Sequence, residues 1–286
     1  MENVAIIAYR HIRLHLTPSP RRLKPSIQMN DRLIPFDRVL NFRDFGGWET
    51  QDGARVARGK LYRSAALHDA TEADIEKLDA MALRFLVDLR RPEERAHEPN
   101  RWANAGRVIF NDEGAGGTSL PPHLLALMQS DLTAQSTRDY MMSLYREIPF
   151  DPRLIGLYRD WFAELGEGGA GVIHCAAGKD RTGIGCALTL IALGVDEEAV
   201  FADYEFTNAA VDLEQRMPRI QQRMEERLGR KLNAEALRPM LGVHVDYLRE
   251  ALNAIEAKHG SALNYLEQAL GVGATERADL RAKLSA

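Results

Sequence analysis

A strand, a tight loop and a helix follow one another around the first of the two cysteines, and this unit constrains the fold more than any other segment. Residues 171–174 form a short apolar run that is typical of a buried strand. Residues 182–193 carry Ile184, Leu188 and Ile191 at helical spacing. A buried strand that leads directly into an apolar helix is typical of α/β domains, in which helices cover a mostly parallel sheet.

The rest of the chain alternates between short apolar runs and helical patterns, and after about residue 209 only helical patterns remain. The segments expected to be regular are strands and turns over 39–67, buried strands at Leu83–Leu89 and Arg107–Phe110, and helices from Thr71 to about Met81, over 154–165 and over 196–207. We therefore expect one domain over residues 31–286, an α/β structure of three layers with a central, mostly parallel sheet flanked by helices. A C-terminal helical extension would begin at about residue 209.

Composition excludes several classes of protein. The 286 residues carry 37 Lys and Arg against 41 Asp and Glu, a net charge of −4 without a strongly basic run, so no nucleic-acid partner is expected. No apolar run approaches the roughly 20 residues that a membrane span needs. The two cysteines, Cys175 and Cys186, are too few for a disulfide framework or a cysteine-rich zinc site. We expect a reducing compartment, the cytoplasm.

The first 28 residues differ from the remainder of the chain. They hold five basic residues against one acidic residue, and their three prolines discourage regular structure. The apolar stretch Val4–Tyr9 is short for the core of a signal peptide, and Arg10 interrupts it. We expect residues 1–30 to form a disordered arm or an extension upstream of a true start at Met29. A targeting or membrane-surface arm is the alternative.

The residues around Cys175 suit phosphate chemistry. Five residues follow this cysteine, and then Arg181, Thr182 and Gly183 open the helix. Backbone N–H groups in a tight loop at a helix N-terminus form an anion site, and their positive field favours a thiolate. A thiolate at the centre of a phosphate-sized nest is an in-line nucleophile for a phosphoryl group. Arg181 would bind two phosphate oxygens, and Thr182 would donate a hydrogen bond to the sulfur. A buried structural cysteine is the alternative.

The loop Ala177-Gly-Lys-Asp-Arg-Thr-Gly183 resembles that of the Cys-x5-Arg protein tyrosine phosphatase superfamily, and within it a branch of bacterial and fungal phosphatases of the type secreted by mycobacteria. Further segments are similar to that branch in the same order: Asn41-Phe-Arg-Asp-Phe-Gly-Gly47, Leu61-Tyr-Arg-Ser64, Val87-Asp-Leu-Arg90 with Glu93-Glu-Arg95, Ala202-Asp-Tyr204, and Gly242-Val-His-Val-Asp-Tyr-Leu248. The resemblance covers roughly residues 39–270 and implies the phosphatase fold.

The resemblance implies an enzyme that hydrolyses phosphate monoesters, foremost protein phosphotyrosine, with broader activity on phosphoserine, phosphothreonine or phosphoinositides. Cys175 would form a phosphocysteine that water then hydrolyses, without a metal or a cofactor. The residues that would bind the phosphate are Ala176, Ala177, Gly178, Lys179, Asp180 and Arg181. His174 and Thr182 would support the loop, and the charge of Lys179 would suit a second phosphate. The residues expected to pair near the loop as supports are Asp44, Arg63, Asp88 and Arg90.

The general acid is the least determined part of the expected site. Departure of an aryl or alkyl oxygen requires its protonation, and tyrosine phosphatases use an aspartate on a loop well before the cysteine. Here the loop after residues 107–110 offers Asp112, which is our choice, and Glu113. Asp180 is the other alternative, because a carboxylate inside an anion-binding loop is unexpected on electrostatic grounds.

Three other classes of protein share parts of this pattern. A phosphoinositide phosphatase would use the same chemistry on another substrate. A phospho-ligand binding module without turnover would be expected to lack the nucleophile or the arginine, yet Cys175 and Arg181 are both present. A rhodanese-like sulfurtransferase also holds a cysteine in an anion loop, but Arg181 followed by Thr182 argues against it. Export by a route that needs no signal peptide is the alternative to a cytoplasmic location.

Overall fold

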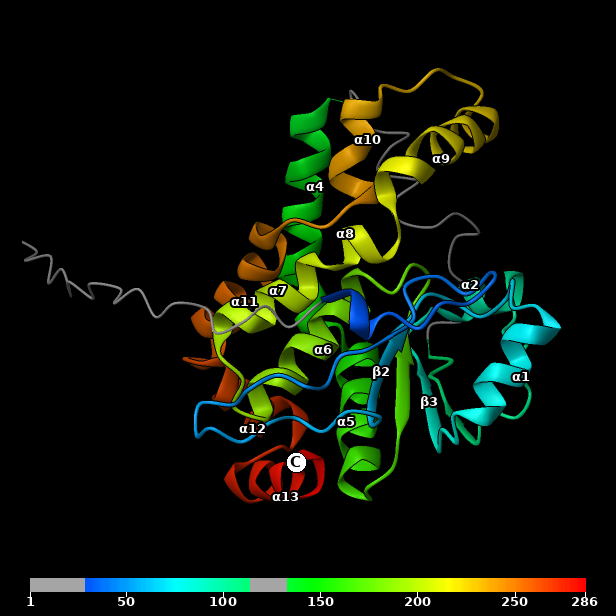
Figure 1. The fold of residues 1–286 in the computed structure, drawn as a ribbon. Helices are drawn as coiled ribbons and strands as arrows, with labels where there is room; N and C mark the ends of the chain where they lie inside the picture. The colour runs from blue at the N-terminus through cyan, green and yellow to red at the C-terminus, as the bar shows by residue number, and fades with distance from the viewer. Residues whose placement is uncertain (1–28, 114–132) are drawn as a thin grey trace, which may run out of the picture.

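The computed structural model describes residues 29–113 and 133–286, and a five-stranded sheet lies at its centre (Figure 1). The strands are β1 (Arg43–Asp44), β2 (Leu61–Ser64), β3 (Phe85–Asp88), β4 (Arg107–Ile109) and β5 (Gly171–His174), in the spatial order β1-β2-β5-β3-β4. β1 is antiparallel to β2, whereas the other three pairings are parallel. Asp88 lies opposite His174, so the carboxyl ends of β3 and β5 meet at one edge of the sheet.

Helices cover both faces of this sheet, which confirms the expected α/β architecture of three layers. The helices are α1 (Glu72–Ala80), α2 (Pro92–His97), α4 (Ala134–Glu147), α5 (Pro152–Gly166), α6 (Asp180–Ala192), α7 (Glu197–Glu205), α8 (Thr207–Ala210), α9 (Leu213–Leu228), α10 (Ala234–Leu241), α11 (Val245–His259), α12 (Ala262–Leu270) and α13 (Ala274–Leu284), with short 3₁₀ turns at Met29–Arg32 and Ile148–Phe150. Helices α5 and α6 pack against one face of the sheet, and α1 lies on the other (Figure 1).

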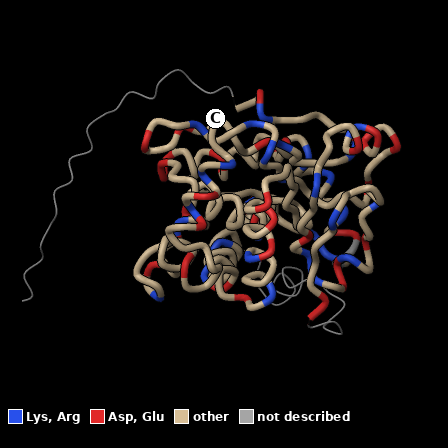
Figure 2. Tube along the Cα trace, turned by 90° about the horizontal axis from the view of Figure 1, so that it is seen from below, with Lys and Arg blue, Asp and Glu red and all other residues tan. Residues whose placement is uncertain are grey.

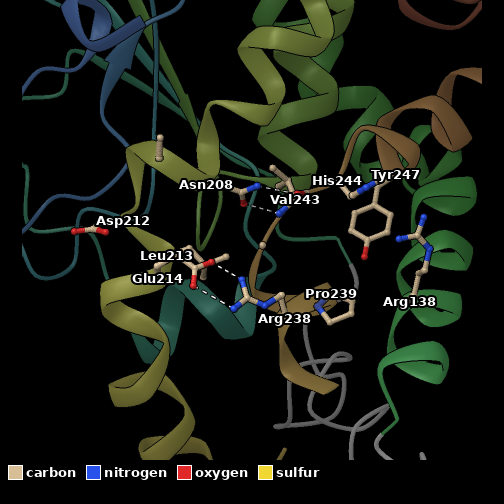
Figure 3. A pocket seen from close by; sticks show the side chains of 12 residues that line it. Arg138, Asn208, Asp212, Leu213, Glu214, Arg238, Pro239, Val243, His244 and Tyr247 are labelled. Carbon is tan, nitrogen blue, oxygen red and sulfur yellow. Dashed lines mark hydrogen bonds and ion pairs between the residues drawn. The ribbon is translucent and has the colours of Figure 1, made fainter. Parts of the chain in front are cut away.

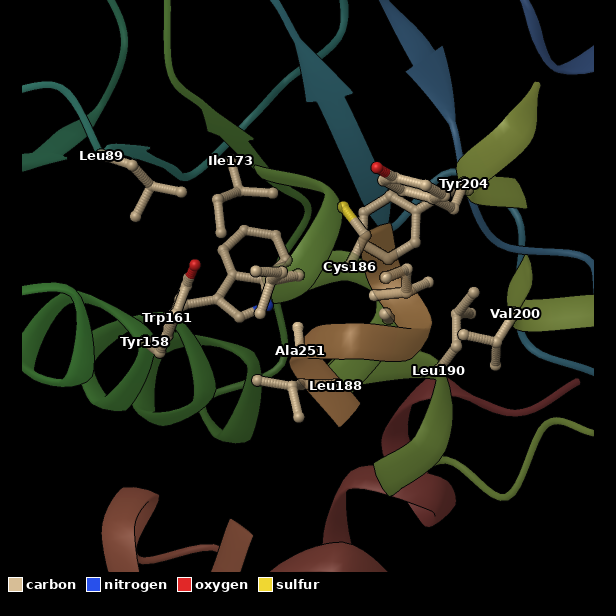
Figure 4. Packing of buried hydrophobic residues seen from close by; sticks show 14 of the residues in the cluster. Leu89, Tyr158, Trp161, Ile173, Cys186, Leu188, Leu190, Val200, Tyr204 and Ala251 are labelled. Atoms are coloured by element: carbon tan, nitrogen blue, oxygen red, sulfur yellow. The ribbon is translucent and has the colours of Figure 1, made fainter. Parts of the chain in front are cut away.

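Successive side chains of the central strands point into two separate cores, as the pleat of a strand requires. In β5, Ile173 belongs to the larger core with Trp161 of α5 and Leu188 of α6 (Figure 4). Its neighbour Val172 belongs to the smaller core, together with Leu78 of α1. Both faces of the sheet are therefore buried, which explains why β5 reads as a continuous apolar run without alternation.

Most of the expected elements lie within a few residues of the observed ones. The helix start at Thr71 is confirmed: its hydroxyl accepts a hydrogen bond from the Asp74 N–H at 3.1 Å, and the Asp74 carboxylate accepts one from the Thr71 N–H at 3.2 Å. Helix α6 begins two residues earlier than the apolar spacing indicated. Asp180 and Arg181 consequently lie in its first turn, at the positive end of the helix dipole.

The strand expected at residues 107–110 is present, but the prediction that it is buried is wrong. β4 is an edge strand that pairs with β3, and of its three residues Ile109 is buried while Arg107 and Val108 are exposed. Phe110, directly after it, is 49% exposed and lies beneath the guanidinium of Arg95, 4.7 Å from it. An edge strand has a single neighbour, so an apolar run there does not require burial on both faces.

From Thr207 onward the described chain is helical, and α9 and α10 rise beyond the carboxyl edge of the sheet, with α10 packed along α4 (Figure 1).

Within residues 29–113 and 133–286, no helix is long and apolar enough to cross a membrane. Acidic and basic residues alternate over the described trace (Figure 2). Residues 1–28 lie outside the described residues, so the expected arm over 1–30 and the domain limits 31–286 stay predictions.

Substitution of Cys186 provides a test of the packing in the larger core. It lies fully buried on α6 beside Tyr204 (Figure 4), and burial raises the pKa of its thiol to about 12, so it stays protonated. Both cysteines are free. We expect Cys186→Ala to cost about 1 kcal/mol of unfolding free energy, since it removes one buried atom, measured by urea denaturation. Cys186→Asp should cost several times more, because it buries a charge. Equal losses in the two variants would contradict this packing.

Candidate active site

The loop from Cys175 to Arg181 joins the carboxyl end of β5 to the first turn of α6. Cys175 is 2% exposed and lies on the wall of a cavity of about 1030 Å³. The loop residues that share this wall are Ala176, Ala177, Lys179, Asp180 and Arg181. The loop thus places a thiol where the carboxyl edge of a parallel sheet meets a helix N-terminus, which is the usual position of an anion site in α/β proteins.

The carbonyl groups of the loop are bound from behind. The side-chain amide of Asn41 donates to the carbonyl oxygens of Ala177 at 3.1 Å and Gly178 at 2.9 Å. Arg63 donates to the same Gly178 oxygen at 2.8 Å. Among the described residues, the N–H groups of residues 176–181 have no protein acceptor. The N–H dipoles are therefore left for a ligand, and together they form a nest for an anion.

Arg63 is the buried centre of these contacts. It is fully buried on β2, and its other terminal nitrogen lies 2.8 Å from a carboxylate oxygen of Asp203 on α7. Arg43 of β1 lies alongside and donates to the Asp203 backbone carbonyl at 3.0 Å and to the Thr207 hydroxyl at 3.1 Å. Two strands and the α7–α8 segment thereby hold the loop, and Thr207 of this segment also borders the cavity.

Two backbone positions of the loop region tolerate few residues. Gly178 has φ +67°, and a Cβ built there would lie 2.2 Å from the Ser64 carbonyl oxygen. Only glycine combines that backbone angle with so close an approach to β2. Asn41 has φ +58°, in the left-handed region that asparagine tolerates better than most residues. These positions explain why glycine and asparagine stand in the two motifs.

Arg181 is held by Glu94 of α2. The Glu94 carboxylate accepts two hydrogen bonds from Arg181, at 2.6 Å from Nη1 and 2.8 Å from Nη2, and Nη1 also donates to the Leu89 carbonyl at 3.2 Å. Burial would raise the pKa of Glu94, but the charge and hydrogen bonds of Arg181 outweigh it and lower the pKa to about 2. Glu94 is therefore ionised at neutral pH and fixes the direction of the guanidinium.

A second arginine lies beside Arg181. Arg153 of α5 is 8% exposed, and its Nη1 donates to the carbonyls of Leu89 at 3.1 Å and Arg90 at 3.2 Å. Because Arg153 and Arg181 share the Leu89 oxygen, their guanidinium groups are neighbours. Burial and the charge of Arg181 lower the pKa of Arg153. Both side chains border the cavity, and their charges make this side of it attractive to an anion.

His174 supports the loop from within the sheet. It is fully buried, and its Nδ1 lies 3.1 Å from the Cys175 carbonyl oxygen. A carbonyl oxygen can only accept a hydrogen bond. Nδ1 therefore carries the proton, and Nε2 accepts from the Asn100 amide at 3.0 Å. Burial lowers the pKa of His174, although Asp88 at 3.5 Å opposes this. A neutral imidazole with both nitrogens engaged suits a supporting position.

Asp180 faces the cavity and is bound by α4. The Tyr145 hydroxyl donates to its carboxylate at 2.7 Å, so the proton in the 2.6 Å contact between Tyr145 and Tyr204 comes from Tyr204. Burial raises the pKa of both tyrosines well above its ordinary value, so both stay protonated. This chain of donors and the α6 N-terminus together stabilise a carboxylate inside the anion loop.

Lys179 and Thr182 differ from their expected surroundings. The Lys179 ammonium donates to the carbonyls of Met240 and Gly242 at the end of α10 and lies 3.5 Å from an Asp180 carboxylate oxygen. The Thr182 hydroxyl is buried, and no hydrogen-bond partner for it is found in the described part of the chain. The expected contact from Thr182 to the Cys175 sulfur is accordingly not formed here.

The two candidate acids before the cysteine are not among the described residues that border the cavity. Asp112 and Glu113 follow β4 and are exposed. Asp112 has a 64% exposed side chain and pairs with Arg95 of α2, which also donates to the Asn111 carbonyl at 3.0 Å. Of the three carboxylates considered from the sequence, Asp180 is the one that the described structure brings beside Cys175.

The remainder of the cavity wall is largely apolar. The larger apolar residues of this wall are, from α4, α5 and the turn between them, Tyr140, Met141, Leu144, Ile148, Phe150 and Leu154, and from the C-terminal helices Leu213, Ile220, Met224, Met240 and Leu241. The arginines that border the same cavity outside the loop are Arg38, Arg91, Arg146, Arg153, Arg216 and Arg223. The helical extension expected after residue 209 thus forms one side of the site. Among the described residues, no group of three or more His, Cys, Asp or Glu side chains could hold a metal ion.

Several site residues were not identified from the sequence. Asn41, Glu94 and Asp203 stand inside motifs that resemble the family, but their contacts do not follow from the sequence. Tyr145 and Arg153 lie on helices, where a polar residue is indistinguishable from a surface one until the helix is placed. Of the four expected supports, Arg63, Asp88 and Arg90 lie around the loop, where Arg90 binds Asp88 at 2.7 Å. The fourth, Asp44, accepts the N–H groups of Gly46 and Gly59 and so fixes the β1–β2 connection.

Glu94→Gln tests the contact that orients Arg181. The pKa of Glu94 is lowered in the folded protein, so its charge stabilises the fold above pH 4.5 and this contribution is lost as the pH falls toward 2. We expect the variant to lose about 3 kcal/mol of unfolding free energy at pH 7, measured by denaturant titration. The difference from the parent should shrink below about pH 5, fall to roughly half or less by pH 3 and nearly vanish only at about pH 2. Glu72→Gln, at an exposed pair with Arg101, is the control and should change little. A pH-independent difference would contradict the pairing.

The chain matches a family model and several known proteins. A model of the tyrosine phosphatase family matches residues 34–286. An assigned tyrosine-protein phosphatase of Cupriavidus necator is 33% identical over 247 residues, covering 84% of each chain. The triple specificity protein phosphatase PtpB of Mycobacterium tuberculosis is 29% identical over 257 residues, covering 78% of this chain and 92% of that protein. The crystal structure of P. aeruginosa TpbA covers 72% of this chain and 97% of its own at 18% identity and a TM-score of 0.28. The chain belongs to the tyrosine phosphatase family and is a protein-tyrosine phosphatase.

Proposed function

We propose that this enzyme hydrolyses protein phosphotyrosine through a phosphocysteine formed on Cys175. The observation that carries the proposal is the state of the loop beside the cavity and the buried thiol: Asn41 and Arg63 bind its carbonyls, while the N–H groups of residues 176–181 have no acceptor among the described residues. Donors arranged in this way match the three outer oxygens of a phosphoryl group and need no reorganisation during the reaction. No metal or cofactor takes part in the proposed reaction.

In the first step the Cys175 sulfur, as thiolate, forms a bond to phosphorus while the bond from phosphorus to the tyrosyl oxygen breaks. The electron pair of the broken bond goes to the tyrosyl oxygen, which takes a proton from the general acid. In the second step water attacks phosphorus, the bond between sulfur and phosphorus breaks, and the ionised acid accepts a proton from that water. Inorganic phosphate leaves and the thiolate is restored.

Arg181 has the free donors that this reaction needs. Glu94 occupies one hydrogen on each terminal nitrogen, and the Leu89 carbonyl takes the second hydrogen on Nη1. The Nε hydrogen and the second Nη2 hydrogen remain, and in a planar guanidinium these two lie side by side. They form a second fork that would bind two phosphate oxygens while Glu94 keeps the group in place.

For the general acid we propose Asp112, with Asp180 and Glu113 as alternatives. Support for Asp112 comes from α2, because Arg95 binds the Asp112 loop while Glu94 on the same helix binds Arg181. Support for Asp180 comes from its position on the cavity wall and its hydrogen bond from Tyr145. The assignments to Asp112 and to Asp180 can be distinguished by how the hydrolysis rates of variants at the two positions depend on the leaving group.

The size and lining of the cavity favour a broader substrate range. A volume of about 1030 Å³ with an apolar wall would accept more than a single phosphotyrosyl side chain. A relative of 29% identity is named a triple specificity phosphatase. We propose phosphoserine, phosphothreonine and phosphoinositides as additional substrates, with a phosphoinositide as the main substrate being the alternative. A reactive thiolate oxidises readily, so a reducing compartment suits it, and we propose the cytoplasm, with export by a route that needs no signal peptide as the alternative.

Cys175→Ser tests the covalent mechanism. A serine hydroxyl ionises far less readily than a thiol, so the variant should lose at least about 10³-fold in turnover of a phosphotyrosine peptide, measured by phosphate release. Inorganic phosphate should still bind within about tenfold of the parent affinity by calorimetry, because the loop N–H groups and Arg181 remain. Undiminished turnover in the variant would exclude the phosphocysteine intermediate. If the parent protein itself showed no turnover, a phospho-ligand binding module would be the remaining hypothesis.

The identity of the general acid is tested with substrates whose leaving oxygens differ in basicity. If Asp112 donates the proton, Asp112→Asn should slow hydrolysis of a phosphotyrosine peptide by about 10² to 10⁴-fold and that of an activated nitrophenyl phosphate much less. The fall in rate at high pH should also disappear, because the protonated acid is the form lost as the pH rises.

Two matched variants distinguish the alternatives. Asp180→Asn and Glu113→Gln make the same chemical change at the other candidate acids. If Asp180→Asn alone shows the dependence on the leaving group, the acid lies inside the loop and the assignment to Asp112 fails. A loss of equal size on both substrates for any variant would indicate a structural role.

A further inference from the structure

Lys179 belongs to the phosphate loop, yet its ammonium lies at the end of a helix 61 residues later in the chain. The ammonium donates to the Met240 carbonyl and, at 3.1 Å, to the Gly242 carbonyl. An Asp180 carboxylate oxygen lies 3.5 Å away. These three oxygens match the three hydrogens of an ammonium, and the side chain is only 11% exposed. Little of its hydrogen-bonding capacity is left for a ligand.

The acceptors are groups that a helix cannot satisfy by itself. Met240 lies in the last turn of α10, and Gly242 is its C-cap. The last carbonyls of a helix have no intrahelical donor and carry the negative end of the helix dipole. A buried ammonium at this position satisfies two of them and places its charge against that dipole. Lys179 is therefore the C-terminal cap of α10, supplied by the phosphate loop.

A second side chain holds the same segment from the other side. Asn208 of α8 donates from its amide nitrogen to the Val243 carbonyl at 2.9 Å and accepts from the Val243 N–H at 2.8 Å (Figure 3). The chain between Met240 and Val243 thus has two tethers, one ionic and one neutral. Asn208 borders a separate cavity of about 450 Å³ and does not border the cavity around Cys175.

The tethered segment belongs to the wall of the active-site cavity. Met240 and Leu241 border the cavity at the end of α10, and Ile220 and Met224 border it on α9. An exposed ion pair between Arg238 of α10 and Glu214 of α9 contributes little (Figure 3). Helix α10 also packs along α4. The tethers at Met240–Val243 therefore fix the C-terminal end of α10, where this wall meets the phosphate loop.

We propose that Lys179 is a positioning residue that ties the wall formed by α9 and α10 to the phosphate loop. Its charge is directed at α10, so it does not serve as the binding group for a second phosphate, which revises the expectation from the sequence. Coupling of this kind is reciprocal: if the wall stabilises the loop, an anion in the loop also stabilises the end of α10. The kinetic consequences rest on the proposed phosphatase reaction, whereas the structural tie does not.

Hydrogen exchange followed by mass spectrometry tests the tie without any turnover. In Lys179→Met, which keeps the aliphatic stem and removes the ammonium, we expect the amides of residues 240–247 to exchange at least tenfold faster than in the parent. Asn208→Ala should have the same effect on the same amides. Saturating inorganic phosphate should slow their exchange in the parent and have no such effect in Lys179→Met. Unchanged exchange in Lys179→Met would overturn the proposal.

Arg38→Met is the matched control for loss of a positive charge. Arg38 also borders the cavity, and its partner is Asp69 at 3.5 Å, far from α10 in the chain. The exchange of residues 240–247 should be the same in this variant as in the parent. A general loosening of the protein by any cation-to-methionine change would instead appear in both variants and would contradict a specific tie.

Kinetics separates positioning from phosphate binding. The probes are an inositol monophosphate and an inositol bisphosphate, used as substrates or as inhibitors of nitrophenyl phosphate hydrolysis. With a positioning role, Lys179→Met should weaken both compounds by the same factor, and Asn208→Ala should weaken them in parallel. A loss confined to the bisphosphate, tenfold or more, with Asn208→Ala unchanged would overturn the proposal. A parent that hydrolyses no phosphate monoester would refute the proposed function, while the exchange experiment would still decide the tie.

Discussion

The buried pair between Arg63 and Asp203 is the contact on which the rest of the site depends. Arg63 lies on β2, Asp203 lies on α7, and neither has water to solvate its charge. Arg43 also lies 3.8 Å from the Asp203 carboxylate, so loss of Asp203 would leave two buried arginines without this partner. Loss of a buried partner charge costs about 3–5 kcal/mol, so the strands and the helix must stay together. Arg63 uses a further donor for the Gly178 carbonyl. The residue that holds the strand to the helix therefore also holds the phosphate loop.

Backbone carbonyls help to hold each cation around the loop, and in Arg153 they leave the charge available to a ligand. Arg153 and Lys179 both bind backbone carbonyls, and Arg181 shares one of those carbonyls while it binds Glu94. A carbonyl supplies a hydrogen bond without cancelling a unit of charge. The same logic explains the carboxylate of Asp180 inside an anion loop. Its negative charge is offset locally by a tyrosine hydroxyl, by the Lys179 ammonium and by the helix dipole, so it does not oppose a phosphate at full strength.

Much of the fold and the centre of the site followed from local signals. The run at 171–174 and the spacing after Cys175 located β5, the loop and α6, because one strand and one helix carry their signal in consecutive residues. Contacts between distant segments left no such signal. The ammonium of Lys179 reaches α10 because of how the C-terminal helices pack, and a lysine beside a phosphate loop reads equally well as a ligand. The exposure of Phe110 followed from the edge position of β4, which a short apolar run cannot reveal.

Helix α2 connects the phosphate loop to the segment that carries Asp112, the proposed general acid. Consecutive residues of a helix point about 100° apart, so Glu94 and Arg95 can face different neighbours. Glu94 binds Arg181, which would hold the phosphoryl group, and Arg95 binds the loop that carries Asp112. Any displacement of α2 would move both together. One short helix could thereby keep a leaving-group acid in register with the phosphate site, although β4 and β5 are not adjacent in the sheet.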